Sequence, residues 1–223
     1  LGSYEGSLGW TQRGEFEQAV DENNARKVEF YAEFKEMDIP TLATNAEAME
    51  AAERLFGNNC STCHGSGGGG AKGFPNLTDN DWLYGGTPEV IKATIMSGRN
   101  GQMPSMAAAL GSDKDVENVA HYVLSLSSNT ADPIKAVFGK AKFGACAACH
   151  GADAHGNQAS GALNLTDKIW LYGGSVDTIM ETIRKGRNNV MPAFQEFLGE
   201  AKVHVLAAYV WSLSNVKSDL SEK

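Results

Sequence analysis

Two five-residue stretches, Cys60-Ser61-Thr62-Cys63-His64 and Cys146-Ala147-Ala148-Cys149-His150, decide how this chain folds. Together they contain all four cysteines of the 223 residues. In each stretch, two thiols three residues apart occupy one helical turn, and a histidine follows directly. The spacing predicts that the two thiols and the imidazole of each stretch face a single bound group.

Cys-x-x-Cys-His is the attachment signature of c-type haem. Each thiol bonds one vinyl group of the porphyrin, and the histidine coordinates the iron. Three alternatives fit the cysteines less well. A zinc ribbon places its pairs about 15–20 residues apart, a thioredoxin-like pair needs a βαβ unit, and a disulfide framework suits a smaller domain. We therefore predict two haems c, attached at Cys60, Cys63, Cys146 and Cys149 and ligated by His64 and His150.

A repeat organises the rest of the chain. Asn-Leu-Thr-Asp at 76–79 recurs at 164–167, and Trp-Leu-Tyr-Gly-Gly at 82–86 recurs at 170–174. Gly-Arg-Asn and Met-Pro segments recur at the same offset of 88 residues, and the linker-like Ser-Ser-Asn-Thr-Ala-Asp-Pro separates the copies. We expect an N-terminal arm at 1–44 and consecutive domains at 45–129 and 130–223.

The periodicity of both copies is helical, so we predict an all-α fold. Apolar residues recur at helical spacing over 113–126, and Thr-Pro-Glu at 87–89 is typical of a helix start. No segment shows convincing strand alternation. Residues 11–38 lie outside the repeat, and Phe16, Val20, Tyr31 and Phe34 indicate an additional amphipathic helix that packs on a domain or a partner. The alternative is a solvated acidic arm that is only partly ordered.

The repeat also selects the second iron ligand. Of seven methionines, only Met103 and Met191 coincide when the copies are superposed, and each precedes a proline that restricts the backbone. His/Met ligation is an established arrangement for haem c, raises the reduction potential and leaves iron no free position. We predict Met103 and Met191 as axial ligands, with Met106 as a second candidate in the first copy.

Two further repeated residues are candidates for the haem periphery. Arg99 and Arg187 carry guanidinium groups suited to haem propionates. Trp82 and Trp170 can pack at the haem edge and donate an indole N–H. Ordinary core and turn roles are the alternative for all four. His121, His155 and His204 do not repeat, so we interpret them as packing or surface residues.

The net charge of −8 argues against nucleic acid as a partner, because phosphate binding needs a basic surface. The net charge rises from −5 over 1–44 and −4 over 45–129 to +1 over 130–223. An acidic first half would suit a basic docking partner, and the alternative is an acidic surface that contacts only solvent.

With these motifs in view, the chain resembles tandem class I cytochromes c, and more closely the dihaem subunit family of cbb3-type haem–copper oxidases. The likeness covers nearly the whole chain, including Gly-Trp-Thr at 9–11 and an acidic helix before the first haem site. Pro75 matches the family proline whose carbonyl accepts a hydrogen bond from the proximal histidine, whereas the second copy has Leu163 there.

The resemblance implies an electron-transfer subunit that is not an enzyme by itself. It would take electrons from a donor cytochrome c and pass them to a monohaem cytochrome subunit and the oxygen-reducing subunit. It also implies a membrane anchor before residue 1 and a position on the periplasmic side of the bacterial inner membrane. The alternatives are a free periplasmic dihaem cytochrome or dehydrogenase subunit, and a dihaem peroxidase if one iron can lose its methionine.

Overall fold

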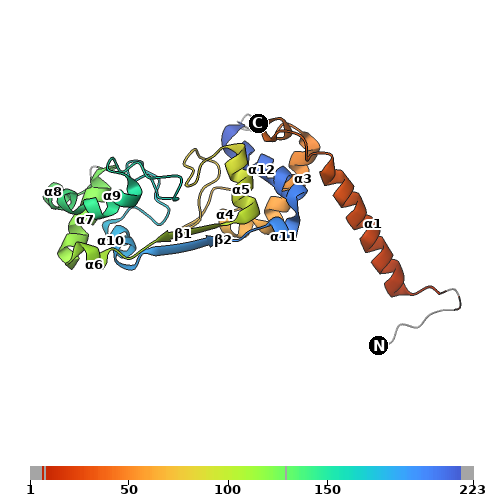
Figure 1. The fold of residues 1–223 in the computed structure, drawn as a ribbon, viewed down its shortest axis with the longest axis horizontal. Coiled ribbons are helices and arrows are strands. Elements are labelled where there is room, and N and C mark those ends of the chain that lie inside the picture. The colour runs from red at the N-terminus through yellow and green to blue at the C-terminus, as the bar shows by residue number, and fades with distance from the viewer. Residues whose placement is uncertain (1–6, 8, 129, 217–223) are drawn as a thin grey trace.

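The computed structural model describes residues 7, 9–128 and 130–216. In this part the chain is mostly helical, and Figure 1 shows two groups of helices joined by a pair of strands, with one long helix projecting away. The elements are α1 (Gln12–Ala32), α2 (Ile39–Leu42), α3 (Ala46–Asn59), α4 (Ser61–His64), α5 (Pro88–Ser97), β1 (Arg99–Met103), α6 (Ala107–Leu110), α7 (Asp113–Ser125), α8 (Pro133–Lys142), α9 (Gly144–His150), α10 (Val176–Lys185), β2 (Arg187–Met191), α11 (Gln195–Leu198) and α12 (Glu200–Asn215).

The helix ends follow local chemistry. Thr87 caps α5 through its side chain and Pro88 occupies the first turn, as the sequence predicted. Ser112 and Asp115 form a capping box at the start of α7, in which each side chain accepts from the other residue's backbone N–H. These signals place the helices that carry the core.

The prediction of an all-α fold needs one correction. β1 and β2 form a two-stranded antiparallel sheet in which Arg99 lies opposite Met191 and Met103 lies opposite Arg187. Gly101 and Asn189 pair at its centre, so the two repeat copies are related by a local two-fold. The segments are polar and short, and their sequence has no apolar alternation that would reveal a strand.

The helices exchange partners beyond this sheet. α12, from the second copy, packs on α2, α3 and α5 of the first. α7, from the first copy, packs on α8 and α10 of the second. The result is a first lobe (34–98 and 192–216) and a second lobe (104–186), each with its own hydrophobic core. The compact units therefore differ from the consecutive domains expected at 45–129 and 130–223.

Repetition explains how the exchange is possible. α7 and α12 present equivalent side chains: Tyr122 contacts Phe143 in the second lobe, and Tyr209 contacts Phe56 in the first. A helix that fits one lobe therefore fits the other, which is the physical basis of domain swapping at low cost. The β1–β2 ladder adds backbone hydrogen bonds that favour the exchanged arrangement.

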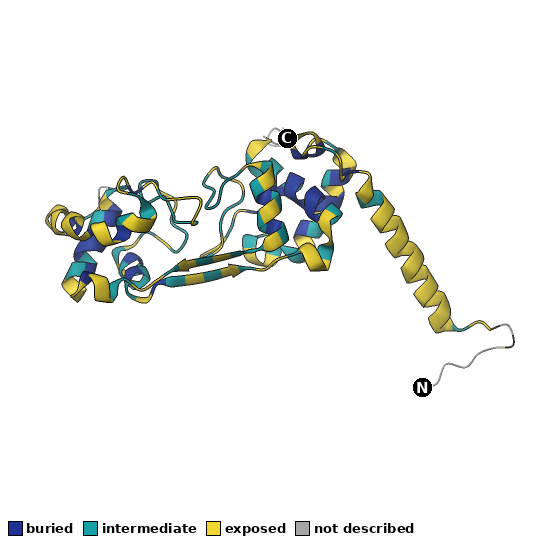
Figure 2. Cartoon of the chain, in the orientation of Figure 1, coloured by how far each residue is buried: buried dark blue, intermediate teal, exposed yellow. Residues whose placement is uncertain are grey.

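The long helix α1 lies within the predicted N-terminal arm, and only one end of it packs on the rest of the protein. None of its side chains is buried, and Phe16 and Val20 are exposed. Figure 2 shows the exposed surface along most of its length. Only Phe30, Tyr31 and the following Phe34 join the core of the first lobe. No helix in the described ranges combines the length and apolar character that crossing a membrane requires.

Candidate functional site

The two attachment sequences lie on short helices at equivalent places in the two lobes. Cys60 precedes α4 and Cys146 lies within α9, and each histidine ends its helix. Cys63 and Cys149 are exposed, Cys60 is half-buried and Cys146 is buried. Each pair therefore offers one inner and one outer thiol, which suits attachment of one planar group along its edge.

Burial raises the pKa of both inner thiols. It raises the pKa of the Cys60 thiol to about 11, with a further contribution from Cys63. Burial also raises the pKa of Cys146, again with Cys149 adding to it.

Both histidines are oriented by a backbone carbonyl. His64 Nδ1 lies 3.0 Å from the Pro75 carbonyl oxygen, and His150 Nδ1 lies 2.8 Å from that of Leu163. A carbonyl only accepts, so Nδ1 donates in both cases and Nε2 carries the lone pair. Leu163 thus makes the contact that the sequence suggested only for proline. Each imidazole presents the nitrogen needed for iron.

The predicted methionines lie at the ends of β1 and β2, where the two repeat copies cross from one lobe to the other. Met191 packs against the core of the first lobe, although it belongs to the second copy. The Phe194 N–H donates to the Ile95 carbonyl at 3.0 Å, and the equivalent Met106 N–H donates to that of Ile183 at 2.8 Å. The chain after each methionine is therefore fastened to the helix of the other copy. Met106 serves this connection and packs in the second lobe.

Arg99 and Arg187 stack on tyrosines that the sequence analysis did not single out. The Arg99 guanidinium lies 4.6 Å from the centre of the Tyr84 ring, and Arg187 lies 4.3 Å from that of Tyr172. Nε of each arginine donates to a threonine hydroxyl of the preceding helix. Both tyrosines belong to the repeated Trp-Leu-Tyr-Gly-Gly motif, which was the available signal.

Trp82 and Trp170 take equivalent places in the two cores. Trp82 packs on the core of the first lobe, and Trp170 packs on that of the second. His204 is buried and its Nε2 contacts the Met37 carbonyl at 2.8 Å. His121 accepts from the Asp132 N–H, and His155 is exposed beside Asp153. These contacts are of the kind that packing and surface residues make, as the sequence analysis interpreted the three histidines.

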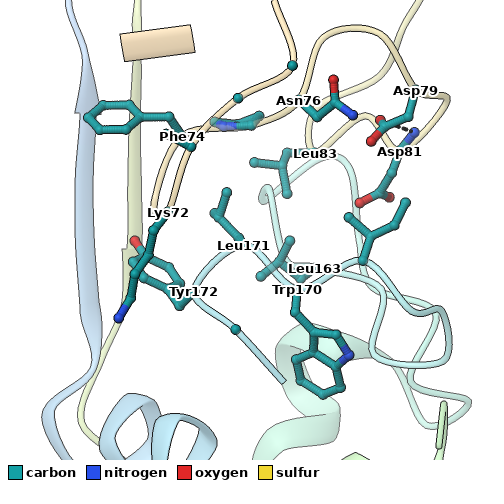
Figure 3. A pocket seen from close by; sticks show the side chains of 16 residues that line it. Lys72, Phe74, Asn76, Asp79, Asp81, Leu83, Leu163, Trp170, Leu171 and Tyr172 are labelled. Carbon is teal, nitrogen blue, oxygen red and sulfur yellow. Dashed lines mark hydrogen bonds between the residues drawn. The ribbon is translucent and has the colours of Figure 1, made fainter. Parts of the chain in front are cut away.

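The loops that follow the attachment histidines meet between the lobes. The Gly73 N–H donates to the Leu171 carbonyl at 2.8 Å, and Gln158 Nε2 donates to that of Trp82 at 3.1 Å. A cavity of about 480 Å³ lies here, lined by both copies. Figure 3 shows Leu83, Leu163 and Leu171 at its centre, with Asp79 and Asp81 on one side.

One polar atom at this meeting point lacks a partner in the described part of the chain. The hydroxyl of Tyr172, a residue that lines the cavity, is buried without a hydrogen bond. A buried hydroxyl normally has a partner. The ring of this tyrosine also carries the stacked guanidinium of Arg187, so an unpartnered hydroxyl and a cation lie on contacting residues.

Comparisons with known proteins agree with this site. The helical fold and the attachment motifs define a cytochrome c. The family model for cytochrome c oxidase, cbb3-type, subunit III matches residues 47–123 and 129–210, and the chain belongs to that family. The cbb3-type cytochrome c oxidase subunit CcoP of Rubrivivax gelatinosus is 50% identical over 98% of this chain and 72% of its own length. The subunit FixP of Azorhizobium caulinodans is 40% identical over 93% and 75%.

Membership of this family defines the general role. The chain is an electron-transfer subunit that carries electrons through c-type haem into a cbb3-type oxidase, and it is not an enzyme by itself.

Proposed function

We propose that the chain holds two haems c and that each iron is ligated across the repeat copies, by His64 with Met191 and by His150 with Met103. The observation that supports this proposal is the exchange of helices between the lobes at the β1–β2 sheet. There Met191 packs in the lobe of His64, and Met103 lies opposite Arg187, the first residue of β2, which follows α10. Met103 and Met191 thus remain the ligands expected from sequence, with exchanged partners.

The side chains fit this cofactor. Each lobe supplies two thiols, an imidazole Nε2 and a thioether, which are the attachment and ligand groups of haem c. The bound group would supply one-electron chemistry. His64, Met191, His150 and Met103 would hold the two irons, and Arg99, Arg187, Trp82, Trp170 and Tyr172 would surround the porphyrin carboxylates and edge. Two protein ligands on each iron favour electron carriage over a peroxidase.

The meeting loops support a relay between the two sites. Asn189 Nδ2 donates to the Gly73 carbonyl at 3.2 Å, in addition to the Gly73–Leu171 and Gln158–Trp82 bonds. Such contacts hold the lobes in one arrangement. Electrons would enter from a donor cytochrome c, cross between the haems and leave to the monohaem and catalytic subunits. The site would face the periplasm of the bacterial inner membrane, held by an anchor before α1.

Crossed ligation can be tested one haem at a time. Cys60→Ala with Cys63→Ala leaves only the haem attached at Cys146 and Cys149. In this background, Met103→Ala should abolish the sulfur-to-iron charge-transfer band of the ferric protein and permit carbon monoxide binding to the ferrous protein. Met191→Ala should change neither spectrum.

The reciprocal background provides the matched control. With Cys146→Ala and Cys149→Ala, Met191→Ala should abolish the band and Met103→Ala should leave it. If each methionine instead affects the haem of its own copy, the ligands are not exchanged. If neither substitution alters either haem, methionine ligation itself is wrong and a closed electron carrier is no longer supported.

A further inference from the structure

The outward side of α8 is apolar although the fold does not require it to be. Ile134, Val137 and Phe138 have relative exposures of 70%, 70% and 60%. They occupy positions i, i+3 and i+4, so they form one stripe. α8 packs inward through Ala136 and Gly139, and a Cβ at Gly139 would collide with the backbone of Asn118 on α7. The apolar stripe is therefore separate from the core contact.

The other repeat copy shows what this helix looks like without such a stripe. Phe143 after α8 and Phe56 of α3 each contact the equivalent tyrosine of the last helix, which aligns the two helices. On this alignment, Ile134, Val137 and Lys140 correspond to Glu47, Glu50 and Glu53, which are all exposed. The same fold therefore tolerates carboxylates at the positions of Ile134 and Val137, and fold stability does not explain these two apolar residues.

The stripe leads to the second attachment site along the chain. Ala141, Gly144, Ala145 and Ala148 are exposed between α8 and the exposed Cys149. A haem bonded at Cys149 would have that corner near the surface, beside small side chains that allow close approach. Short distance between cofactors is what a redox encounter needs, so this surface is positioned for electron exchange with a partner.

Charge indicates the chemistry of that partner. Segment 133–150 carries three lysines and no carboxylate, whereas 46–64 carries three glutamates and one arginine. Lys135 and Lys142 also contact Glu117 and Asp115 of α7, and Lys140 has no carboxylate partner among the described residues. The second lobe has 7 basic and 8 acidic side chains, against 5 and 10 in the first. An acidic partner is therefore repelled less by the second lobe.

We propose that the exposed face of α8 and α9, from Ile134 to Cys149, is the docking surface for the electron donor, a small redox protein whose apolar contact patch is bordered by carboxylates. The proposal rests on the proposed function in that the second lobe must hold a haem. One electron passes from the donor metal to the ferric iron, and no bond is made or broken. α8 lies at the opposite end of the molecule from α1 (Figure 1), so the proposed anchor leaves this face accessible.

Electron exchange with an acidic blue-copper protein tests the surface. The ferrous dihaem protein is mixed with the oxidised copper protein, and one electron passes from iron(II) to copper(II). The test variant Ile134→Glu/Val137→Glu/Lys140→Glu installs the residues of α3. We expect its second-order rate constant at low ionic strength to fall at least about tenfold, and the wild-type rate to decrease with added salt.

The matched control also changes two exposed apolar residues and one lysine, elsewhere on the protein. Val28→Glu/Phe197→Glu/Lys27→Glu alters the charge equally on α1 and α11, where these side chains are exposed. Compared with wild type at about 0.1 M ionic strength, its rate constant should stay within about twofold, since the Debye length is then about 10 Å and charges on α1 and α11 are screened from α8. Equal rates for the test variant and wild type would overturn the proposal.

Other occupants of the surface give different results. Wild-type binding to vesicles with anionic lipid, lost in the test variant while the copper rate is unchanged, would identify a membrane contact and overturn the donor site. Dimerisation of wild type alone in sedimentation, again with an unchanged rate, would identify self-association. Reduction by dithionite distinguishes a failure of the proposed function from a failure of the docking proposal. If the wild-type haems accept no electrons, the proposed function is wrong. If they are reduced normally, a negative rate experiment rules out only the docking surface.

Discussion

At the scale of single residues, the exchange depends on two glycines. Gly98 and Gly186 have φ of +69° and +71°, where L residues are strained. A Cβ at Gly98 would meet the Met191 carbonyl and the Pro192 backbone, and one at Gly186 would meet those of Met103 and Pro104. Each glycine therefore allows the methionine segment of the other copy to pass close by.

We expect Gly98→Ala and Gly186→Ala each to destabilise the protein by at least about 1 kcal/mol, because the backbone strain and the contact with the crossing chain act together. Chemical denaturation of the haem-loaded protein measures the change in the free energy of unfolding. Gly57→Ala is the control: its Cβ would meet nothing within 4 Å inside α3, so it should stabilise by about 0.5–1 kcal/mol. A neutral Gly98→Ala would contradict the close approach.

The same scale shows what single residues in a sequence can predict. The cysteines and histidines were predictable because their chemistry needs those side chains at that spacing. The contact from His150 to the Leu163 carbonyl was not, because every residue has a carbonyl and only the backbone path decides which one is near. Tyr84 and Tyr172 repeated visibly, but their stacking under Arg99 and Arg187 is a tertiary property.

At the scale of elements, the helices were predictable and the strands were not. Caps and apolar periodicity indicated α5 and α7, whereas β1 reads Arg-Asn-Gly-Gln-Met and carries neither β-branched nor aromatic residues. Its half-burial comes from pairing with β2, which a local pattern cannot report. Local propensity describes elements that the chain forms by itself and misses those formed by a distant partner.

The capping box of α7 predicts a pH dependence. The Ser112 hydroxyl and backbone N–H both lower the pKa of the Asp115 carboxyl. Because this pKa is lowered in the folded state, the carboxylate stabilises the fold above its unfolded value of about 4, and this contribution is lost as the pH falls through the folded pKa. We expect Asp115→Asn to lower the melting temperature at pH 7 and to reduce the loss of stability between about pH 5 and 2.

Asp177→Asn is the control for that substitution. It removes a first-turn carboxylate from α10, where the Ser175 cap bonds to Thr178. Thermal melts of the haem-loaded proteins across the pH range give the comparison. An acid profile that changes equally in both variants would mean that net charge, and not the reciprocal bond to Ser112, controls the effect.

The exposed helix α1 leads to a deletion experiment. Since none of its side chains is buried, removing residues 1–29 should change the free energy of unfolding by less than about 1 kcal/mol and leave the haem spectra intact. Phe34→Ala in the intact chain is the contrasting variant, because Phe34 is buried at 5% exposure. It should cost about 3 kcal/mol. A large loss on deletion would show that α1 supports the first lobe.

At the scale of the whole molecule, the sequence could not reveal which copy of the last helix fills which lobe. α7 and α12 present equivalent tyrosines to equivalent phenylalanines, so consecutive and exchanged arrangements bury the same side chains. The repeat predicts which kinds of helix each lobe contains. Which copy supplies the last helix of a lobe is decided by the β1–β2 ladder and by the path of the chain after Met103 and Met191.

Exchange also makes the two halves of the chain interdependent. Residues before the 128–132 linker contribute α7 to the second lobe, and residues after it contribute α12 to the first. α12 alone places six buried apolar side chains, including Val203 and Leu206, in the first-lobe core. Separating the halves would expose both cores, which is far more costly than separating two domains that touch at a surface.

Cutting the linker therefore tests the architecture directly. A protease site inserted after Ser128 should give two fragments that migrate together in native gel filtration and separate only in denaturant. The haem spectra should remain unchanged. Calorimetry should show one main unfolding transition, since each lobe contains helices from both fragments. A cut inserted after Glu29 is the control, because it should release the exposed part of α1, which precedes Phe30 and contributes no buried side chain. Fragments that part under native conditions, each with one intact haem, would establish consecutive domains and overturn crossed ligation as well.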